Sequence, residues 1–205
     1  MNDTIQPYTT PVLLNQVIQQ LQDQFAQLTW LETVYPLVQV GQRQVQLNGN
    51  ERRVRYPQVY RNDGKTYQHF ISPDRSAKSF CFFELNAPYS FDFNDLLIRT
   101  GQAAFNLNIV VWLNLPKIDP QRAYDFTEEL IQDFVQHGLM ASVHKVSIQD
   151  LFVERRQELI FNRYDYSIAE EQFLIFPYSG FKVTLTLNSG YNVYCVPQWE
   201  TLPEA

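Results

Sequence analysis

The sequence is poor in the residues from which common catalytic motifs are built. It has seven glycines, and it contains neither the glycine-rich phosphate loop of nucleoside triphosphatases nor the dinucleotide-binding fingerprint. A Gly-x-Ser-x-Gly nucleophile elbow is absent as well. These absences disfavour an enzyme, although catalytic triads are defined by geometry rather than by sequence spacing.

Cysteines and long hydrophobic runs are also scarce. Cys81 and Cys195 each stand in an apolar, strand-like run without a Cys-x-x-Cys pair. We therefore expect two buried reduced thiols, with one long-range disulfide as the alternative. The longest apolar run near the middle, Ile109 to Leu113, is far shorter than a membrane span. The first residues, MNDTIQ, show no secretory signal, so we expect cytoplasmic synthesis and no membrane partner.

The chain has no overall basic surplus, because its net charge is −6. The charge is unevenly spread: from Arg43 to Lys78 there are eight basic and three acidic residues, a balance of +5, which leaves −11 for the remainder. A solvated hairpin region with ordinary surface arginines is one interpretation. The other is a basic face that meets the acidic face of a neighbouring copy, as in ring-forming interfaces. Overall acidity and the lack of a recognised motif disfavour nucleic acid.

Two helices are predicted from apolar spacing. Thr10 and Pro11 favour the start of the first helix, and its apolar residues recur from Leu14 to Leu28. The second is expected to begin after Asp119 as its cap and to close at His137 and Gly138, with Glu128, Glu129 and Asp133 on its solvent side.

Alternating residues and turn signals predict a strand-rich remainder. The expected strands are 37–47 with a bend at Gly41 to Arg43, 54–60 (confined by Pro57 to an edge or interrupted strand), 67–71, 80–85, 105–114, 173–176, 181–187 and 191–196. Turns are expected at 48–50 and 189–190, a connection over 87–101, a brief strand near 143–146 and a short helix from Ser147 to about Phe161.

These elements define the expected fold class. We predict a single α+β domain over residues 1–205, mainly an antiparallel sheet of six or more strands with two principal helices packed on one face. A strand-rich C-terminal element over residues 170–205 is a possible addition.

Two sets of side chains are candidates for a ligand or a reaction. Asp92, Asp95 and His69 could build an unpatterned catalytic site, but turn carboxylates and ordinary strand residues explain them equally. The three histidines, His69, His137 and His144, lack the spacing of a helical zinc site.

Five tyrosines gather in the last third of the chain, namely Tyr164, Tyr166, Tyr178, Tyr191 and Tyr194. Tyr178, Tyr191 and Tyr194 are the proposed surface of an alternative glycan- or peptide-binding module; ordinary half-buried strand aromatics are the competing interpretation.

Three segments carry a family resemblance. VRYPQVYRNDGKTYQHFISPD, SFCFFEL and RYDYSIAEEQFLIFPYSGFKVTLTLNSGY resemble segments of small virion-morphogenesis proteins from prophages of Bacteroidetes. The order of elements is similar to that of phage tail-terminator and tail-completion proteins, which is an analogy at the level of fold. The resemblance implies a non-enzymatic protein that forms a homo-oligomeric ring at a tail or head–tail junction. It also implies other virion proteins as partners, no cofactor, assembly in the bacterial cytoplasm and a final place in the virion.

The charge pattern supplies the residues of the predicted self-association interface. Its basic side is predicted to be Arg52, Arg53, Arg55 and Arg61, and its acidic side Glu128, Glu129 and Asp133. No metal ligands are assigned.

Overall fold

A six-stranded sheet forms the centre of the molecule. The computed structural model describes residues 12–47, 49–60, 68–86, 90–95, 100–139, 146–166 and 175–192. The strand order is β1-β5-β7-β9-β8, with β6 also paired to β7. The bounds are β1 (Thr33–Leu37), β5 (Ser79–Leu85), β6 (Ser90–Asp95), β7 (Thr100–Asn114), β8 (Val146–Glu154) and β9 (Tyr178–Asn192). β1 runs parallel to β5, and the other pairs are antiparallel.

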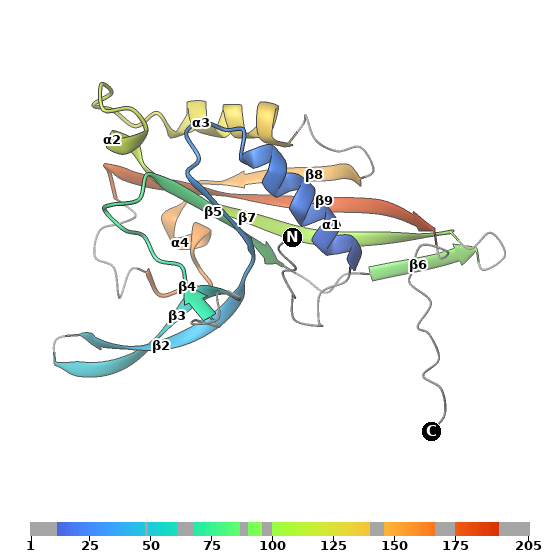
Figure 1. Cartoon of the computed structure of the whole chain (residues 1–205), viewed down its shortest axis with the longest axis horizontal. Helices are drawn as coiled ribbons and strands as arrows, with labels where there is room; N and C mark the ends of the chain where they lie inside the picture. The colour runs from blue at the N-terminus through green and yellow to red at the C-terminus, as the bar shows by residue number, and fades with distance from the viewer. Residues whose placement is uncertain are drawn as a thin grey trace, which may run out of the picture.

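Helices cover one face of this main sheet (Figure 1). They are α1 (Val12–Phe25), α3 (Thr127–Asp133) and a π-helical extension, η1 (Phe134–Leu139). Leu14 and Phe25 of α1 and Phe134 of η1 are fully buried against alternate residues of β7 and β9 such as Leu107 and Leu185. The α+β fold with two principal helices on one face is therefore confirmed.

A smaller sheet covers the other face. It has the order β2-β3-β4, with β2 (Gln39–Leu47), β3 (Asn50–Tyr60) and β4 (Gln68–Phe70). The short helix α4 (Gln157–Ile160) lies on the same side. A second core forms there, in which Trp112 and Phe82 of the main sheet pack with Tyr56, Ile71 and Tyr166. The face of β7 that carries Asn108, Val110, Trp112 and Asn114 is consequently buried as well, with Asn106 half-buried.

Of the two bends predicted for the hairpin β2–β3, one is confirmed. The expected bend at Gly41 to Arg43 is wrong, because β2 continues to Leu47 and pairs there with Asn50. The turn predicted at 48–50 is confirmed, since the chain reverses between Leu47 and Asn50, and Gly49 has a positive φ of 79° that favours glycine. Gly41 instead serves close packing, since a Cβ on it would lie 2.7 Å from Cε1 of Phe70.

Pro57 does not confine its strand to an edge, because β3 lies between β2 and β4. The carbonyl of Pro57 accepts a hydrogen bond from the backbone N–H of Ile71, one residue beyond the end of β4. In an antiparallel strand the N–H and C=O of one residue point to the same side. The N–H that proline lacks would therefore face the place where β4 ends, so few ladder bonds are lost.

Four further predictions are wrong, the first three because sheet pairing overrides local signals. Residues 87–101 are not only a connection, since β6 and the first residues of β7 lie within them. Ser189 and Gly190 make no turn and pair with Ala103 and Gln102 inside β9. Most of the helix predicted from Ser147 is the strand β8, and only α4 is helical. Ile175 and Phe176 lie outside any strand, contrary to the strand predicted over 173–176.

The second helix starts later than predicted. Asp119 ends the short helix α2 (Leu115–Ile118), and its carboxylate accepts the N–H of Gln121 instead of capping a long helix. α3 begins at Thr127, whose N–H donates to Oδ1 of Asp125 at 2.9 Å. Glu128 therefore lies in the first helical turn, where a carboxylate interacts favourably with the helix dipole.

The predicted C-terminal element is partly merged into the main sheet. β9 lies between β7 and β8, so residues 178–192 are central to the main sheet. The strand expected at 191–196 and the brief strand near 143–146 fall mostly outside the described residues, as do Thr10 and Pro11.

Gly180 lies at a position where the backbones of β7 and β9 are close together. It pairs with Trp112, and a Cβ at this position would lie 2.6 Å from the carbonyl oxygen of Val111. We expect Gly180→Ala to lower the free energy of unfolding by about 1–3 kcal/mol, since backbone must move. Gly138→Ala is the comparison, because the atoms nearest to its Cβ would belong to side chains, the nearest being the ring of Phe25 at 3.2 Å, and not to the backbone. Urea unfolding measures both, and equal midpoints for the two variants would contradict this account.

Candidate interaction surfaces

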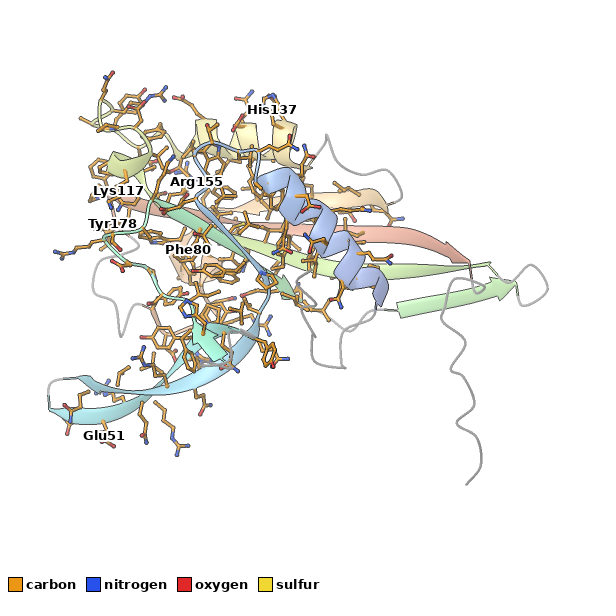
Figure 2. All side chains as sticks on the ribbon, viewed as in Figure 1. Glu51, Phe80, Lys117, His137, Arg155 and Tyr178 are labelled. Atoms are coloured by element: carbon orange, nitrogen blue, oxygen red, sulfur yellow. The ribbon has the colours of Figure 1, made fainter. Side chains whose placement is uncertain are left out.

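The outer half of the β2–β3 hairpin is a two-stranded arm. We define the arm as residues 42–53, and Figure 1 shows the hairpin extending away from the main sheet. Along the arm Gln42, Arg43, Gln44, Gln46 and Gly49 to Arg53 are exposed, and Val45 is half-buried. Figure 2 shows Glu51 at this outer end, away from the packed side chains of the body. The polar and charged side chains described along the arm are therefore open to solvent, whereas Val45 packs against the second core.

The arm is basic. It carries three arginines (Arg43, Arg52 and Arg53) against Glu51, a balance of +2. Arg52 and Arg53 are adjacent, so their side chains project from opposite faces of the hairpin. Both predicted interface residues are exposed. The third, Arg61, lies outside the described residues.

Arg55, the fourth predicted interface arginine, has a partner within its own chain. Its Nε and Nη2 donate to the two carboxylate oxygens of Asp165, at 3.1 and 2.9 Å. The backbone N–H of Arg55 also donates to Asp165, and the N–H of Asp165 donates to the carbonyl of Arg55 at 3.0 Å. Hydrogen bonding from Arg55 lowers the pKa of Asp165. Arg55 thus secures the base of the arm.

The three predicted acidic residues on α3 also have internal partners. Glu128 accepts from Nη1 of Arg155 at 2.8 Å, and Glu129 forms an ion pair with Arg122. Their side chains remain 83% and 58% exposed, so each can still meet another molecule.

Asp133 differs from these two glutamates, because it joins two elements. It accepts the indole N–H of Trp30 at 2.6 Å and lies 2.7 Å from Nδ1 of His137. We conclude that it has a structural role besides any contact with a partner.

The predicted tyrosine cluster is divided by the fold. Tyr164 and Tyr166 are buried in the second core, so they are not surface aromatics. Tyr178 is half-buried and stacks on Trp112, with ring centroids 5.6 Å apart. Tyr191 lies on β9 beside Gly101, and Tyr194 is outside the described residues. Of the predicted binding surface, only the side chain of Tyr178 can be located.

The predicted catalytic candidates occupy two separate strands. His69 is on β4 and faces the ring of Tyr35 at 6.1 Å. Asp92 and Asp95 are on β6, opposite Gln102 and Thr100, with a register irregularity between them. Within the described residues no group of three or more His, Cys, Asp or Glu side chains could hold a metal ion. His144 lies outside the described ranges.

Of the two cysteines only Cys81 is described. It is a buried free thiol whose pKa is raised by burial, which keeps it protonated and unreactive. Cys195 falls in a range that the structure does not describe.

Sequence reasoning missed a buried polar row across the main sheet. Glu84 on β5, Asn108 on β7 and Thr184 on β9 lie opposite one another. Thr184 donates to Oδ1 of Asn108 at 2.9 Å, and Nδ2 of Asn108 donates to Oε2 of Glu84 at 3.4 Å. Nη1 of Arg163 lies 3.7 Å from the same carboxylate oxygen. One indication of this row was present in the sequence, namely the single acidic residue, Glu84, near the end of the apolar run FCFFEL.

This polar row secures the segment that follows α4. Glu84 is 2% exposed, and burial followed by the charge of Glu84 raises the pKa of the Tyr164 hydroxyl. The next residue along the chain is Asp165, the partner of Arg55. Glu84 therefore lies beside the segment 163–165, and Nη1 of Arg163 also donates to the carbonyl of Leu85 at 3.1 Å.

β8 is an edge of the main sheet with exposed apolar side chains. Phe152 is 68% exposed and Val153 is 38% exposed. From Val146 to Glu154 the strand contains no lysine or arginine, which are residues that proteins often place on edges to prevent association. Its register irregularity lies between Ile148 and Asp150, so the pairing is regular from Asp150 onwards.

Comparisons of the chain with protein-family models, with curated proteins and with solved structures found no match. None of the helices among the described residues has both the length and the apolar character needed to cross a membrane.

The Arg55–Asp165 pair predicts an acid-dependent contribution to stability. Because the folded-state pKa of Asp165 is lowered, this contribution is present above the unfolded-state pKa of about 4 and is lost as the pH falls through the folded value. We expect Asp165→Asn to cost about 1 kcal/mol at pH 7, a figure limited by solvent screening of the half-exposed Arg55. Urea unfolding at pH 7 and pH 3 measures the difference, which should shrink at pH 3.

Asp150→Asn provides the control, since Asp150 is an exposed carboxylate on β8. A loss for Asp165→Asn that is equally large at both pH values would contradict the ion-pair explanation.

Proposed function

We propose that this chain is a non-enzymatic assembly protein that associates with further copies of itself through the arm. The exposure of the described polar and charged residues of the arm, 42–44, 46 and 49–53, carries this proposal. An isolated two-stranded hairpin is only marginally stable in water. A second surface that covers the arm would bury Val45 and the aliphatic parts of its arginines, which favours association.

The charge distribution supports contact between unlike surfaces. The arm has a balance of +2, which leaves −8 for the remainder of the chain. Two arms would repel each other, whereas an arm would be attracted to an acidic body. A contact between two different surfaces is heterologous, and it generates a ring when the rotation between copies closes.

The resemblance to tail-terminator and tail-completion proteins supplies the proposed setting. Those proteins combine an N-terminal helix, a hairpin-rich sheet and a helix after a long central strand, and the corresponding elements of this chain are α1, the sheet with the β2–β3 hairpin, and α3 following β7. We therefore propose a ring at a phage tail or head–tail junction. It would be assembled in the bacterial cytoplasm, would contact other virion proteins and would be retained in the virion. No cofactor, nucleic acid or membrane is part of this proposal.

Within the predicted interface, the internal contacts favour some residues over others. Arg52 and Arg53 are the exposed basic residues of the predicted set, while Arg55 is paired with Asp165. Glu128 and Glu129 are the acids with most of their surface exposed. We propose that these four residues, rather than Arg55 and Asp133, contribute to contacts between copies.

Charge reversal on the arm tests the proposal. We expect Arg52→Glu combined with Arg53→Glu to weaken self-association roughly tenfold or more, because like charges then face each other across the contact. Light scattering over a concentration series, at low and at moderate salt, measures the mass and its salt dependence. The control variant carries the same charge change on the body, at Arg75 and Lys117, which belong to another exposed region.

A second variant removes the arm without disturbing its base. Replacing residues 44–53 by Asn-Gly leaves Arg43 paired with Val54 and provides a favoured hairpin turn. This variant should be a folded monomer by circular dichroism and light scattering. An oligomer that survives arm removal, or a wild-type chain that remains monomeric at every concentration and salt, would overturn the proposed function.

A further inference from the structure

This inference rests on the proposed function and concerns the surface that receives the arm. The main sheet has two terminal strands in its principal order, β1 and β8. β1 is half-buried along its whole length and lies beside α1. β8 is more open, with Phe152 and Val153 exposed. The outer edge of β8 is therefore the better site for another strand.

The surroundings of β8 are acidic. Arg155, just after β8, forms ion pairs with Asp125 and Glu128, and this places the start of α3 near the end of the strand. Around this point lie five acids (Asp125, Glu128, Asp150, Glu154 and Glu158) and three basic residues (Arg155, Arg156 and Lys182, which pairs with Glu154 in the sheet), a balance of −2. A basic strand is thus the complementary occupant.

The arm presents such a strand. β2 is the outer strand of the order β2-β3-β4, so one of its backbone edges is unpaired within the described residues. It is nine residues long, as is β8. Its only charged residue is Arg43, and Arg52 and Arg53 follow on the adjacent strand.

We infer that β2 of the arm pairs with the β8 edge of a neighbouring copy and so extends that copy's main sheet by the hairpin. Backbone hydrogen bonds between two edge strands supply affinity, and the side chains beside them supply selectivity. Charge selects this pairing over the two symmetric alternatives. Joining β8 to β8 would oppose two acidic edges, and joining arm to arm would oppose two basic ones. Phe152 becomes covered in the pairing.

Cysteine cross-linking tests the pairing directly. In a Cys195→Ser chain, in which Cys81 is buried, one sample carries Gln44→Cys on β2 and a second carries Gln149→Cys on β8. Both glutamines are exposed. After mixing and treatment with a short bismaleimide, we expect a cross-linked dimer that neither sample forms by itself. Gln19→Cys on the exposed side of α1 replaces Gln149→Cys in the control mixture.

The outcomes separate this inference from the proposed function. The arm-to-β8 pairing would be overturned, while self-association stands, if the oligomer forms but the mixed samples give no cross-linked dimer. The same holds if the Gln149→Cys sample forms cross-links by itself. A chain that stays monomeric overturns both. Phe152→Ser should weaken association several-fold without changing its salt dependence, because the side chain is apolar and uncharged. An unchanged association constant for this variant would also count against the pairing.

Discussion

The structure depends on the antiparallel pairing of β7 and β9, each fifteen residues long. Their register runs without a break from Thr100 opposite Asn192 to Asn114 opposite Tyr178. Both faces of β7 are buried from Phe105 to Asn114, except at the half-buried Asn106. One face holds the helices and the other holds the smaller sheet, so every described layer packs against this pair. Gly180 marks the closest approach, since any larger side chain there would meet the backbone of β7.

A series of polar contacts leads from the β7–β9 pair to the base of the arm. Asn108 and Thr184 belong to β7 and β9, and Asn108 donates to the buried Glu84. Glu84 lies near Arg163, and two residues further along Asp165 holds Arg55. A buried carboxylate is costly unless it is paired and hydrogen-bonded. Oε2 of Glu84 has both kinds of partner, in Arg163 and Asn108, whereas its buried Oε1 has no hydrogen-bond partner.

The internal ion pairs indicate which charged side chains remain available for a partner. On α3, Glu128 and Glu129 pair with Arg155 and Arg122 yet remain mostly exposed, whereas Asp133 contacts Trp30 and His137. At the arm, Arg55 is satisfied by Asp165. Arg52 and Arg53 lie further out on the hairpin, and both are exposed. Surface ion pairs between long side chains contribute little to stability, so the internal pairs on α3 add little to the fold.

The sequence by itself determined the α+β class, both principal helices and the central strands, because apolar periodicity is strong from Leu14 to Leu28 and from Phe105 to Leu113. It also identified Arg52 and Arg53 as members of a basic region. Only the tertiary structure decided which local signals were overridden. Ser189 and Gly190 read as a turn but pair within β9, and the region after Ser147 reads as a helix but forms β8, because pairing with a long neighbour outweighs local propensity. The buried Glu84 row and the Arg55–Asp165 pair join residues far apart in the chain, and no local pattern encodes such contacts.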